Sequence, residues 1–340
     1  MVEAATLNEV LISTKDVVRT AHDVTINTKA LDDFARSLRG DARTAARPWD
    51  QCDCHLIVDV TTDDGAELTA LYVLLLDCMN FCFWPAGNFE YEQLGNGVKW
   101  ALTGPQGSEW CKMDRLAEVT ADEVCDWFNH GAGIVDEKDG WRPQEFPLIS
   151  ERVRLVREVA RGLRDEYHGS ALELVESADG SALRLMRILS AQFSGFRDQA
   201  IDPDTGRQVF LYKRAQICTA DVWGAFRRDG KSVREKLNFR DMRALTMFPD
   251  YRVPQLLRHK GILIYSSRLE NIIDSGRTIP AGSRTELEIR ACTVHACHEI
   301  VEIAQREDIF DVTLDWLLWQ EGEAVRDEIK PHHRTLTIFY

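Results

Sequence analysis

The chain has 340 residues in an ordinary globular balance, 44% hydrophobic and 28% charged, and no apolar run approaches the roughly 20 residues of a membrane helix. Its formal net charge of −14 disfavours stable binding to a nucleic acid, because neutralised phosphates supply most of that affinity. Nine scattered cysteines and a start without a secretory signal favour a reducing, cytoplasmic setting, and we expect a monomer without a cofactor that binds neither membrane nor nucleic acid.

Residues 1–147 are predicted to form a front half of the molecule. Within it, the apolar segment 54–62 (CHLIVDVTT) has the character of a strand. The span from about residue 85 to 147 is predicted to be largely irregular, as a binding face or a surface insertion, because turn-forming residues recur in it. Its Gly- and Asp-rich end, 131–147, marks the boundary to a second half, residues 148–340. We expect both halves to form one compact unit around a single site.

Apolar residues at helical spacing dominate the second half. Ser150 is expected to be the N-cap of its first helix. Strand-like text is limited to 207–213 and the tail 335–340. The predicted helices span 150–167, 180–193, 213–226, 252–263, 266–276, 284–307 and 311–329. The chain is therefore predicted to be mainly α-helical with a small β element.

Asp250 lies inside the apolar and aromatic run TMFPDYRVPQLL, residues 246–257. An ionised carboxylate in such surroundings is costly unless it is paired or used in chemistry. One interpretation is structural: Asp250 precedes a helix whose first turn holds Pro254, so it caps the free N–H groups. The other is functional, a carboxylate held at the wall of an apolar pocket between Phe248 and Tyr251. The two interpretations are compatible, because a capping position holds a carboxylate rigidly.

Two aromatic stretches are compatible with either core packing or a flat binding surface. In LDWLLWQ (314–320), helical spacing makes Asp315 and Trp319 neighbours, and likewise Trp316 and Gln320. Such a face offers indoles for stacking and a carboxylate and an amide for the edges of a heterocycle. The run NFCFWPAGNF (80–89) concentrates aromatic side chains before a turn, as a hydrophobic core or as a stacking wall.

Basic residues gather locally on this acidic chain. The terminal PHHRTLTIFY carries His333 and Arg334, and YKRAQ carries Lys213 and Arg214. These cations are either solvated surface charges or a pocket for one phosphate group.

Two Cys- and His-containing stretches resemble metal motifs only superficially. CTVHACHE (292–299) lies on a predicted helix, where Cys297 is roughly 160° around the axis from His295. Tetrahedral zinc needs ligands that converge, usually from different elements. The other stretch, CDCH (52–55), offers further Cys and His side chains, but we expect no metal site. Fingerprints of dinucleotide sites, P-loops, serine hydrolases and zinc proteases are absent from the sequence.

Taken together and in order, the motifs resemble those of the queuosine salvage proteins, a family of queuosine 5′-phosphate N-glycosylases. The resemblance runs from about residue 10 to the end. Its main segments are DCMNFCFW (77–84), FPLISERVRLVREV (146–159), SGFRD (194–198), LYKRAQICTADVW (211–223), LTMFPDYRVPQLL (245–257), YSSRL (265–269), ELEIRA (286–291), LDWLLW (314–319) and PHHRTLTIFY (331–340). It implies a helical fold similar to helix-hairpin-helix DNA glycosylases but without their DNA-binding equipment. It also implies hydrolysis of queuosine 5′-monophosphate to queuine and ribose 5-phosphate.

Carried over by position, the resemblance implies a set of site residues. Phe248, Asp250, Asp315 and Trp316 should line the queuine site. Because N-glycoside cleavage needs negative charge near the sugar, our hypothesis is that Asp250 and Asp315 are the catalytic carboxylates, with Asp250 preferred because its position before a helix is more rigid. The remaining acid is expected to hydrogen-bond the base. The substrate-binding set is Phe248, Tyr251, Trp316, Gln320, His55, Asn80, Phe83, Trp84 and Asp198, and the phosphate-binding set is Lys213, His333 and Arg334.

The sequence departs from the family pattern at three places, and the first two leave room for a related substrate. Gln320 stands where the family usually has Asp, and Leu336 replaces an Arg of the terminal motif. The family's GYWSL stretch has GSEW (107–110) as its nearest counterpart. Other classes of function remain open at this point. They are a non-catalytic binding protein for queuine or a related deazapurine, a helical interaction protein, and a metal-dependent nucleoside hydrolase.

Overall fold

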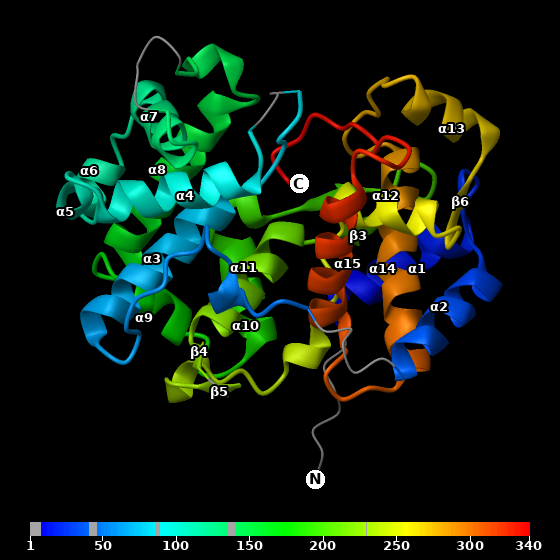
Figure 1. Ribbon diagram of the computed structural model, residues 1–340, viewed down its shortest axis with the longest axis horizontal. Helices are drawn as coiled ribbons and strands as arrows, with labels where there is room; N and C mark the ends of the chain where they lie inside the picture. The colour runs from blue at the N-terminus through cyan, green and yellow to red at the C-terminus, as the bar shows by residue number, and fades with distance from the viewer. Residues whose placement is uncertain (1–7, 41–45, 86–88, 135–139, 229) are drawn as a thin grey trace.

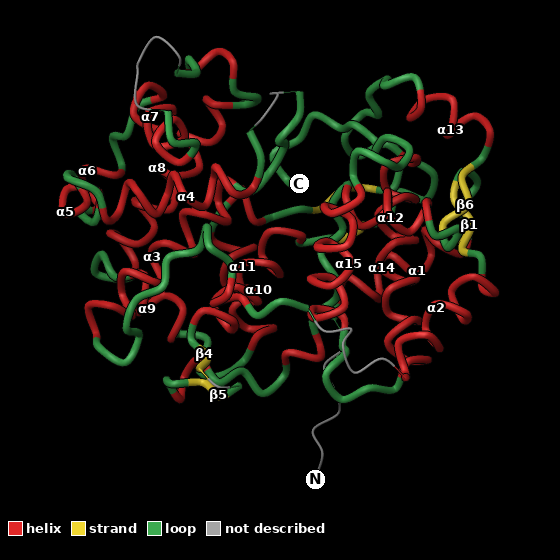
Figure 2. The backbone as a smooth tube through the Cα atoms, in the orientation of Figure 1, coloured by secondary structure: helices red, strands yellow, loops and turns green. Residues whose placement is uncertain are grey.

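Helices dominate the computed structural model, which describes residues 8–40, 46–85, 89–134, 140–228 and 230–340 (Figures 1 and 2). This confirms the predicted mainly α class, whereas the likeness to helix-hairpin-helix glycosylases stays a prediction. The strands in these ranges pair as short antiparallel ribbons. The pairs are β1 (Val24–Ile26) with β6 (Leu263–Tyr265), β2 (Gln199–Ile201) with β3 (Gln208–Phe210), and β4 (Arg227–Arg228) with β5 (Lys231–Ser232).

One group of helices is built around α14 (Arg284–Ala304), on the right in Figure 1. Ser283 starts this helix by accepting a hydrogen bond from the Glu286 amide, and Gln305 ends it in the left-handed conformation with φ 51°. Around it pack α1, α2, α12 and α15, and α13 follows β6. Their bounds are α1 (Glu9–Arg19), α2 (Thr28–Gly40), α12 (Arg252–His259), α13 (Ser267–Asp274) and α15 (Asp311–Val325).

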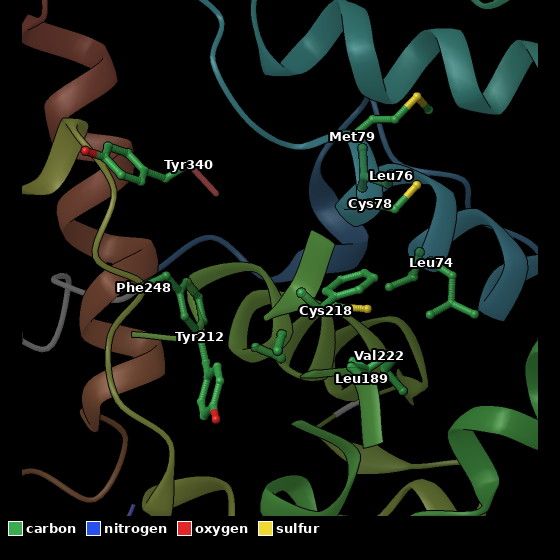
Figure 3. Close-up of a cluster of buried hydrophobic side chains, with 14 of the residues drawn as sticks. Leu74, Leu76, Cys78, Met79, Leu189, Tyr212, Cys218, Val222, Phe248 and Tyr340 are labelled. Atoms are coloured by element: carbon green, nitrogen blue, oxygen red, sulfur yellow. The ribbon is translucent and has the colours of Figure 1, made fainter. Parts of the chain in front are cut away.

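The other group is built around α3 (Asp63–Met79), which is buried along most of its length. Figure 3 shows Leu74 and Cys78 of this helix beside Cys218 and Val222 of α11, with which α3 packs. Burial of these apolar side chains stabilises the folded state by about 25 cal/mol for each Å² of apolar surface removed from water. The group comprises α4 (Tyr91–Thr103), α5 (Gly107–Trp110), α6 (Met113–Leu116), α7 (Ala121–Gly131), α8 (Ile149–Glu166), α9 (Ala171–Glu176), α10 (Ala182–Gln192) and α11 (Lys213–Ala225).

The prediction of a largely irregular span from about residue 85 to 147 is wrong, because α4 to α7 lie within it. Two of the glycines that suggested loops, Gly97 and Gly131, are contact points between α4 and α7. A Cβ on Gly97 would lie 2.7 Å from the Trp127 carbonyl oxygen, so glycine allows α4 to approach α7 closely. Thr120 and Glu123 form a capping box at the start of α7, a signal that the sequence carried.

Other local predictions need correction. The segment 54–62 and the tail 335–340 contain no strand; both run as irregular backbone that buries some apolar residues and leaves others, such as Ile57 and Leu336, exposed, and a bridge between Thr278 and Arg334 lies just before the tail. Ser150 lies inside α8, whose N-cap is Leu148 at φ 54°. The helix expected over 252–263 ends at His259, where β6 soon follows. The remaining predicted helices are confirmed within a few residues of their bounds.

Helices α1 and α2 pack on α14, whereas α3 packs on α8, α9 and α11. The two-part division stays a prediction. Over the described ranges, none of the helices combines the length and apolarity that a membrane span requires.

Candidate active site

A pocket lies where the two groups of helices meet, and most of the predicted site residues line it. It is built from the segment 47–55, the start of α4, the start of α11, the segment 248–251 and α15. The predicted residues in its wall are His55, Asn80, Phe83, Lys213, Phe248, Asp250, Tyr251, Asp315, Trp316 and Gln320.

Asp250 combines the two interpretations given above. Its Oδ1 accepts hydrogen bonds from the amides of Arg252 (2.9 Å) and Val253 (3.0 Å), which begin α12. The same side chain lines the pocket. Burial raises the pKa of Asp250, and the neighbouring Lys213 ammonium and the two amides oppose that rise.

Asp315 reaches the same pocket from α15. Its Oδ1 accepts a hydrogen bond of 2.9 Å from the Phe248 amide. Burial, and next the negative charge of Asp250, raise the pKa of Asp315 well above its ordinary value. The two acids are therefore unequal. Asp250 has two amide donors and the stronger influence of Lys213, so Asp315 is the one that holds a proton more firmly.

Lys213 is the first residue of α11 and follows Tyr212, which has the left-handed φ of 48°. Its Nζ is buried and donates to the Asn80 carbonyl oxygen over 3.3 Å. Burial lowers the pKa of Lys213, and the negative charge of Asp250 is the largest opposing cause. An ammonium group has three donors, so Lys213 keeps donor capacity toward the pocket.

Asp198 does not line the pocket but supports it from behind. Its carboxylate forms a buried ion pair with Arg290 and accepts a hydrogen bond of 3.1 Å from the Lys213 amide. Arg290 in turn donates from Nε to the Pro249 carbonyl oxygen over 2.8 Å. One ion pair therefore fixes the backbone beside both Lys213 and Asp250.

Aromatic rings form the walls of the pocket. The Trp49 ring stacks on His55 with centroids 4.0 Å apart, and His55 Nε2 lies 2.9 Å from the Tyr91 hydroxyl. The Tyr91 ring meets Trp319 edge to face at 5.6 Å. Trp84 was expected in this wall, but it lies outside the pocket lining, where the Arg334 guanidinium is 5.8 Å from its ring centroid.

Of the three residues expected to bind phosphate, only Lys213 lines the pocket. His333 is buried with Nε2 3.3 Å from the Tyr340 hydroxyl, and burial lowers the pKa of His333 to about 3, so the imidazole is neutral at pH 7. The tail packs against the protein through the buried Tyr340, but it places His333 and Arg334 outside the pocket wall.

The two substituted family positions have distinct environments. The Gln320 side chain forms two hydrogen bonds with the backbone of Arg47. It accepts from the Arg47 amide (2.9 Å) and donates to the Arg47 carbonyl oxygen (3.4 Å). Gln320 thus holds the segment that carries Arg47 to the pocket rim. Leu336 is exposed on the surface and is not part of the pocket wall.

Sequence reasoning assigned no role to several pocket residues. Asp221, from the ADVW part of a family motif, lines the pocket while its Oδ2 is buried without a hydrogen-bond partner among the described residues. Burial and then the nearby Asp77 raise the pKa of Asp221 well above its ordinary value, and burial raises the pKa of Asp77 to about 7. The motif itself was the available signal. The other unassigned wall residues are Arg47, Pro48, Trp49, Cys52, Glu90, Tyr91, Glu92, Ile217, Glu323 and Tyr340, and Trp319 of the predicted aromatic face also lines the pocket.

The two Cys- and His-containing stretches differ in how their side chains are arranged. On α14, His295 approaches Thr14 (3.0 Å) and His298 approaches Asp311 (3.3 Å), which confirms that these side chains diverge. In contrast, Cys52, Cys54 and His55 place one sulfur or nitrogen atom each within 4.8 Å of one another. Both nitrogens of His55 already have partners, the Trp49 carbonyl oxygen and the Tyr91 hydroxyl, so a metal ion would have to displace one of them.

Comparison with known proteins agrees with the motifs. A family model described as queuosine salvage protein matches residues 60–340. Among similar proteins, one from Dictyostelium discoideum named queuosine 5′-phosphate N-glycosylase/hydrolase is 39% identical over 324 residues, covering 93% of this chain and 94% of that protein. Proteins of the same name from Sphaerobacter thermophilus and Bos taurus are 37% identical over 342 residues (97% of each chain) and 31% identical over 299 residues (81% of this chain and 82% of that protein).

Proposed function

Because the chain belongs to the queuosine salvage protein family, we propose that it hydrolyses the N-glycosidic bond of queuosine 5′-monophosphate, releasing queuine and ribose 5-phosphate. One observation carries the proposal: Asp250 and Asp315, from distant parts of the chain, line a single aromatic pocket beside a buried lysine. Such an arrangement suits a cationic, oxocarbenium-like transition state, which needs negative charge near the sugar and a proton for the leaving base.

The different environments of the two acids divide the work between them. Asp250, stabilised as a carboxylate by two amides and Lys213, faces the developing cation and takes a proton from the attacking water. Asp315, with its pKa raised well above the ordinary value, supplies a proton or a hydrogen bond to the base. The bond from ribose C1′ to the base nitrogen breaks with its electron pair leaving on the base, and the water oxygen bonds to C1′.

The wall residues fit the two ends of this nucleotide. Phe248 and Trp316 offer flat faces for the deazapurine ring, and ring stacking holds the base while excluding water. The Lys213 ammonium is the buried cation of the pocket wall and is proposed to bind the 5′-phosphate, fixing the ribose by remote binding energy. Glu323 and Glu90 in the pocket wall are already paired with Arg252 and Arg326, so Glu92 is the wall acid proposed to favour a cationic substituent on the base, such as the secondary amine of queuine.

The substrate is proposed to be a free nucleotide that a monomer meets in the cytoplasm. The net charge of −14 supports this, because it repels a polyanion far more than a single phosphate group. Light scattering on the purified chain, and a tRNA-binding assay at low salt, test the two parts. A stable dimer or micromolar tRNA binding contradicts them.

The central experiment incubates purified protein with queuosine 5′-monophosphate and, separately, with the four ordinary nucleotides. Free queuine and ribose 5-phosphate, measured by chromatography, are expected from the first incubation alone. Tight queuine binding without release of ribose 5-phosphate would instead indicate a binding protein. Loss of turnover in the presence of a chelator would indicate a metal-dependent hydrolase. If the protein neither binds queuine nor turns over the nucleotide, the remaining alternative is a helical interaction protein.

A further inference from the structure

A pair of cysteine sulfurs lies in the pocket wall, close enough to react with each other. The Sγ atoms of Cys52 and Cys54 are 3.0 Å apart, about 1 Å longer than a disulfide bond. Cys52 is partly exposed and lines the pocket, whereas Cys54 is buried behind it. Among the described residues, no other two cysteine sulfurs are in hydrogen-bond contact.

The surrounding contacts hold the pair at this distance. The carbonyl oxygen of Cys54 accepts a hydrogen bond from the buried Tyr72 hydroxyl (3.1 Å), and α4 approaches it closely at Gly95. Cys52 lies in a turn in which its carbonyl oxygen accepts a hydrogen bond of 3.0 Å from the His55 amide. Cys54 is thus anchored in the core, and Cys52 is the partner that has room to move.

We propose that Cys52 is a modification site of the pocket wall: hydroperoxides oxidise it, and Cys54 then closes a reversible Cys52–Cys54 disulfide. In the first step the Cys52 thiolate attacks the peroxide, giving a sulfenic acid and releasing hydroxide or an alkoxide. In the second step the Cys54 thiol displaces water from that sulfur, and the disulfide forms. Two thiols and one hydroperoxide thus become one disulfide, water and an alcohol, or a second water when the oxidant is hydrogen peroxide.

The environment of Cys52 supports its role as the attacking sulfur. The Cys54 thiol, as a hydrogen-bond donor, is the largest cause that lowers the pKa of Cys52, and His55 beside it acts in the same direction. A thiolate is the nucleophilic form of cysteine. Cys111 is an exposed residue, but partial burial of its thiol raises its pKa. Cys111 can therefore serve as the internal reference against which the reactivity of Cys52 is measured.

Closing this disulfide would change the pocket directly. Cys52 would move toward Cys54 and away from the pocket, and the turn that ends at His55 would move with it. His55 is held between the Trp49 carbonyl oxygen and the Tyr91 hydroxyl, so these two wall residues would also shift. Any effect on turnover rests on the function proposed above, whereas the modification itself does not.

The first test compares thiol reactivity within one molecule. Reduced protein is treated with limiting iodoacetamide at about pH 6, where ordinary thiols near pKa 8.5 react slowly. Peptide mass spectrometry is expected to show Cys52 alkylated at least about 10-fold faster than Cys111, although Cys111 is the more exposed. Equal labelling, or faster labelling of Cys111, would overturn the proposal.

The second test follows oxidation by hydrogen peroxide. Cys52 and Cys54 are expected to become resistant to alkylation together and to recover together after dithiothreitol. In Cys54→Ala the recovery of Cys52 should be lost, because no thiol is present to protect the sulfenic acid from further oxidation. Cys111→Ser is the matched control and should behave as the unmodified chain. A disulfide that involves another cysteine, or full recovery in Cys54→Ala, would refute the pairing.

Activity is measured in parallel, each variant relative to its own reduced form. Peroxide should inactivate the unmodified chain and dithiothreitol should restore it, whereas Cys54→Ala should not be restored. If the disulfide forms and turnover is unchanged, the proposed effect on the pocket is wrong. If reduced protein shows no turnover at all, the function proposed above fails while the labelling result stands.

Discussion

The backbone amide of Phe248 donates a hydrogen bond of 2.9 Å to the carboxylate of Asp315, 67 residues further along the chain. This bond joins the segment that carries Asp250 to α15, so the two acids of the pocket share one structural connection. A change at either acid therefore acts on the electrostatic environment of the other, as the dependence of the Asp315 pKa on Asp250 also indicates.

Asp250→Asn should lower kcat by at least about 100-fold, the usual scale for losing an acid–base group. The asparagine oxygen can still accept from the Arg252 and Val253 amides, so the start of α12 should remain intact. Steady-state kinetics with queuosine 5′-monophosphate measure the rate. Queuine affinity and thermal unfolding are the controls for an intact pocket and an intact fold. Near-normal turnover would rule out Asp250 as the catalytic base.

The pH dependence of kcat/KM should be bell-shaped. Activity rises with pH as Asp250 ionises, with an apparent pKa above that of an ordinary aspartate because burial raises it. Activity falls again as Asp315 loses its proton at a still higher pH, because its pKa is raised well above the ordinary value. Asp315→Asn should lower the rate and remove the alkaline limb. If the alkaline limb persists in that variant, another group supplies the proton.

Lys213→Met should weaken use of the nucleotide more than of the unphosphorylated nucleoside. Loss of a hydrogen bond to a charged group, about 1.5–3 kcal/mol, corresponds to a roughly 10- to 150-fold fall in the ratio of the two kcat/KM values. The acidic limb of the pH profile should also move to higher pH, because Lys213 opposes the raised pKa of Asp250. Lys15→Met, an exposed change on α1, is the control. An unchanged ratio would place the phosphate elsewhere.

Arg290→Met should reduce the free energy of unfolding by about 3–5 kcal/mol, because it leaves the buried Asp198 carboxylate without its cation. It should also lower kcat, since the Pro249 carbonyl oxygen loses its donor beside Asp250. Urea unfolding and kinetics measure the two effects. Arg268→Met removes the largely exposed partner of Asp23 and should cost no more than about 1 kcal/mol. Equal losses in the two variants would contradict the supporting role of Arg290.

Asp77→Asn should stabilise the protein at pH 8 more than at pH 5. Burial raises the pKa of Asp77 to about 7, so the folded state holds a proton that the unfolded state releases near pH 4. Folding stability from this group therefore falls as pH rises from about 4 to 7 and then levels off. The gain in the free energy of unfolding at pH 8 should be on the order of 1–3 kcal/mol. It is smaller than the roughly 4 kcal/mol that a shift of three pKa units represents, because the side-chain NH₂ group of the new asparagine would lack an acceptor. Urea unfolding at both pH values checks the sign.

Local signals in the sequence were sufficient for most helices of the second half. Spacing of apolar residues located α8, α10, α11, α14 and α15, and the proline at position 254 located the start of α12. The same signals failed between residues 85 and 147, where Gly95 and Gly97 resemble loop residues. Only the presence of a neighbouring helix shows that these glycines permit close packing.

The sequence motifs by themselves identified the functional groups of the candidate site: the aspartates at 250 and 315, the lysine at 213 and the aromatic residues around them. Tertiary structure decided which of these groups meet. It turned His333 and Arg334 away from the pocket wall, moved Asp198 behind it, and brought Cys52 and Asp221 into it. The physical reason is that residue types follow from covalent structure, whereas the pKa of an acid or the reactivity of a thiol depends on burial and on charges that arrive from distant segments.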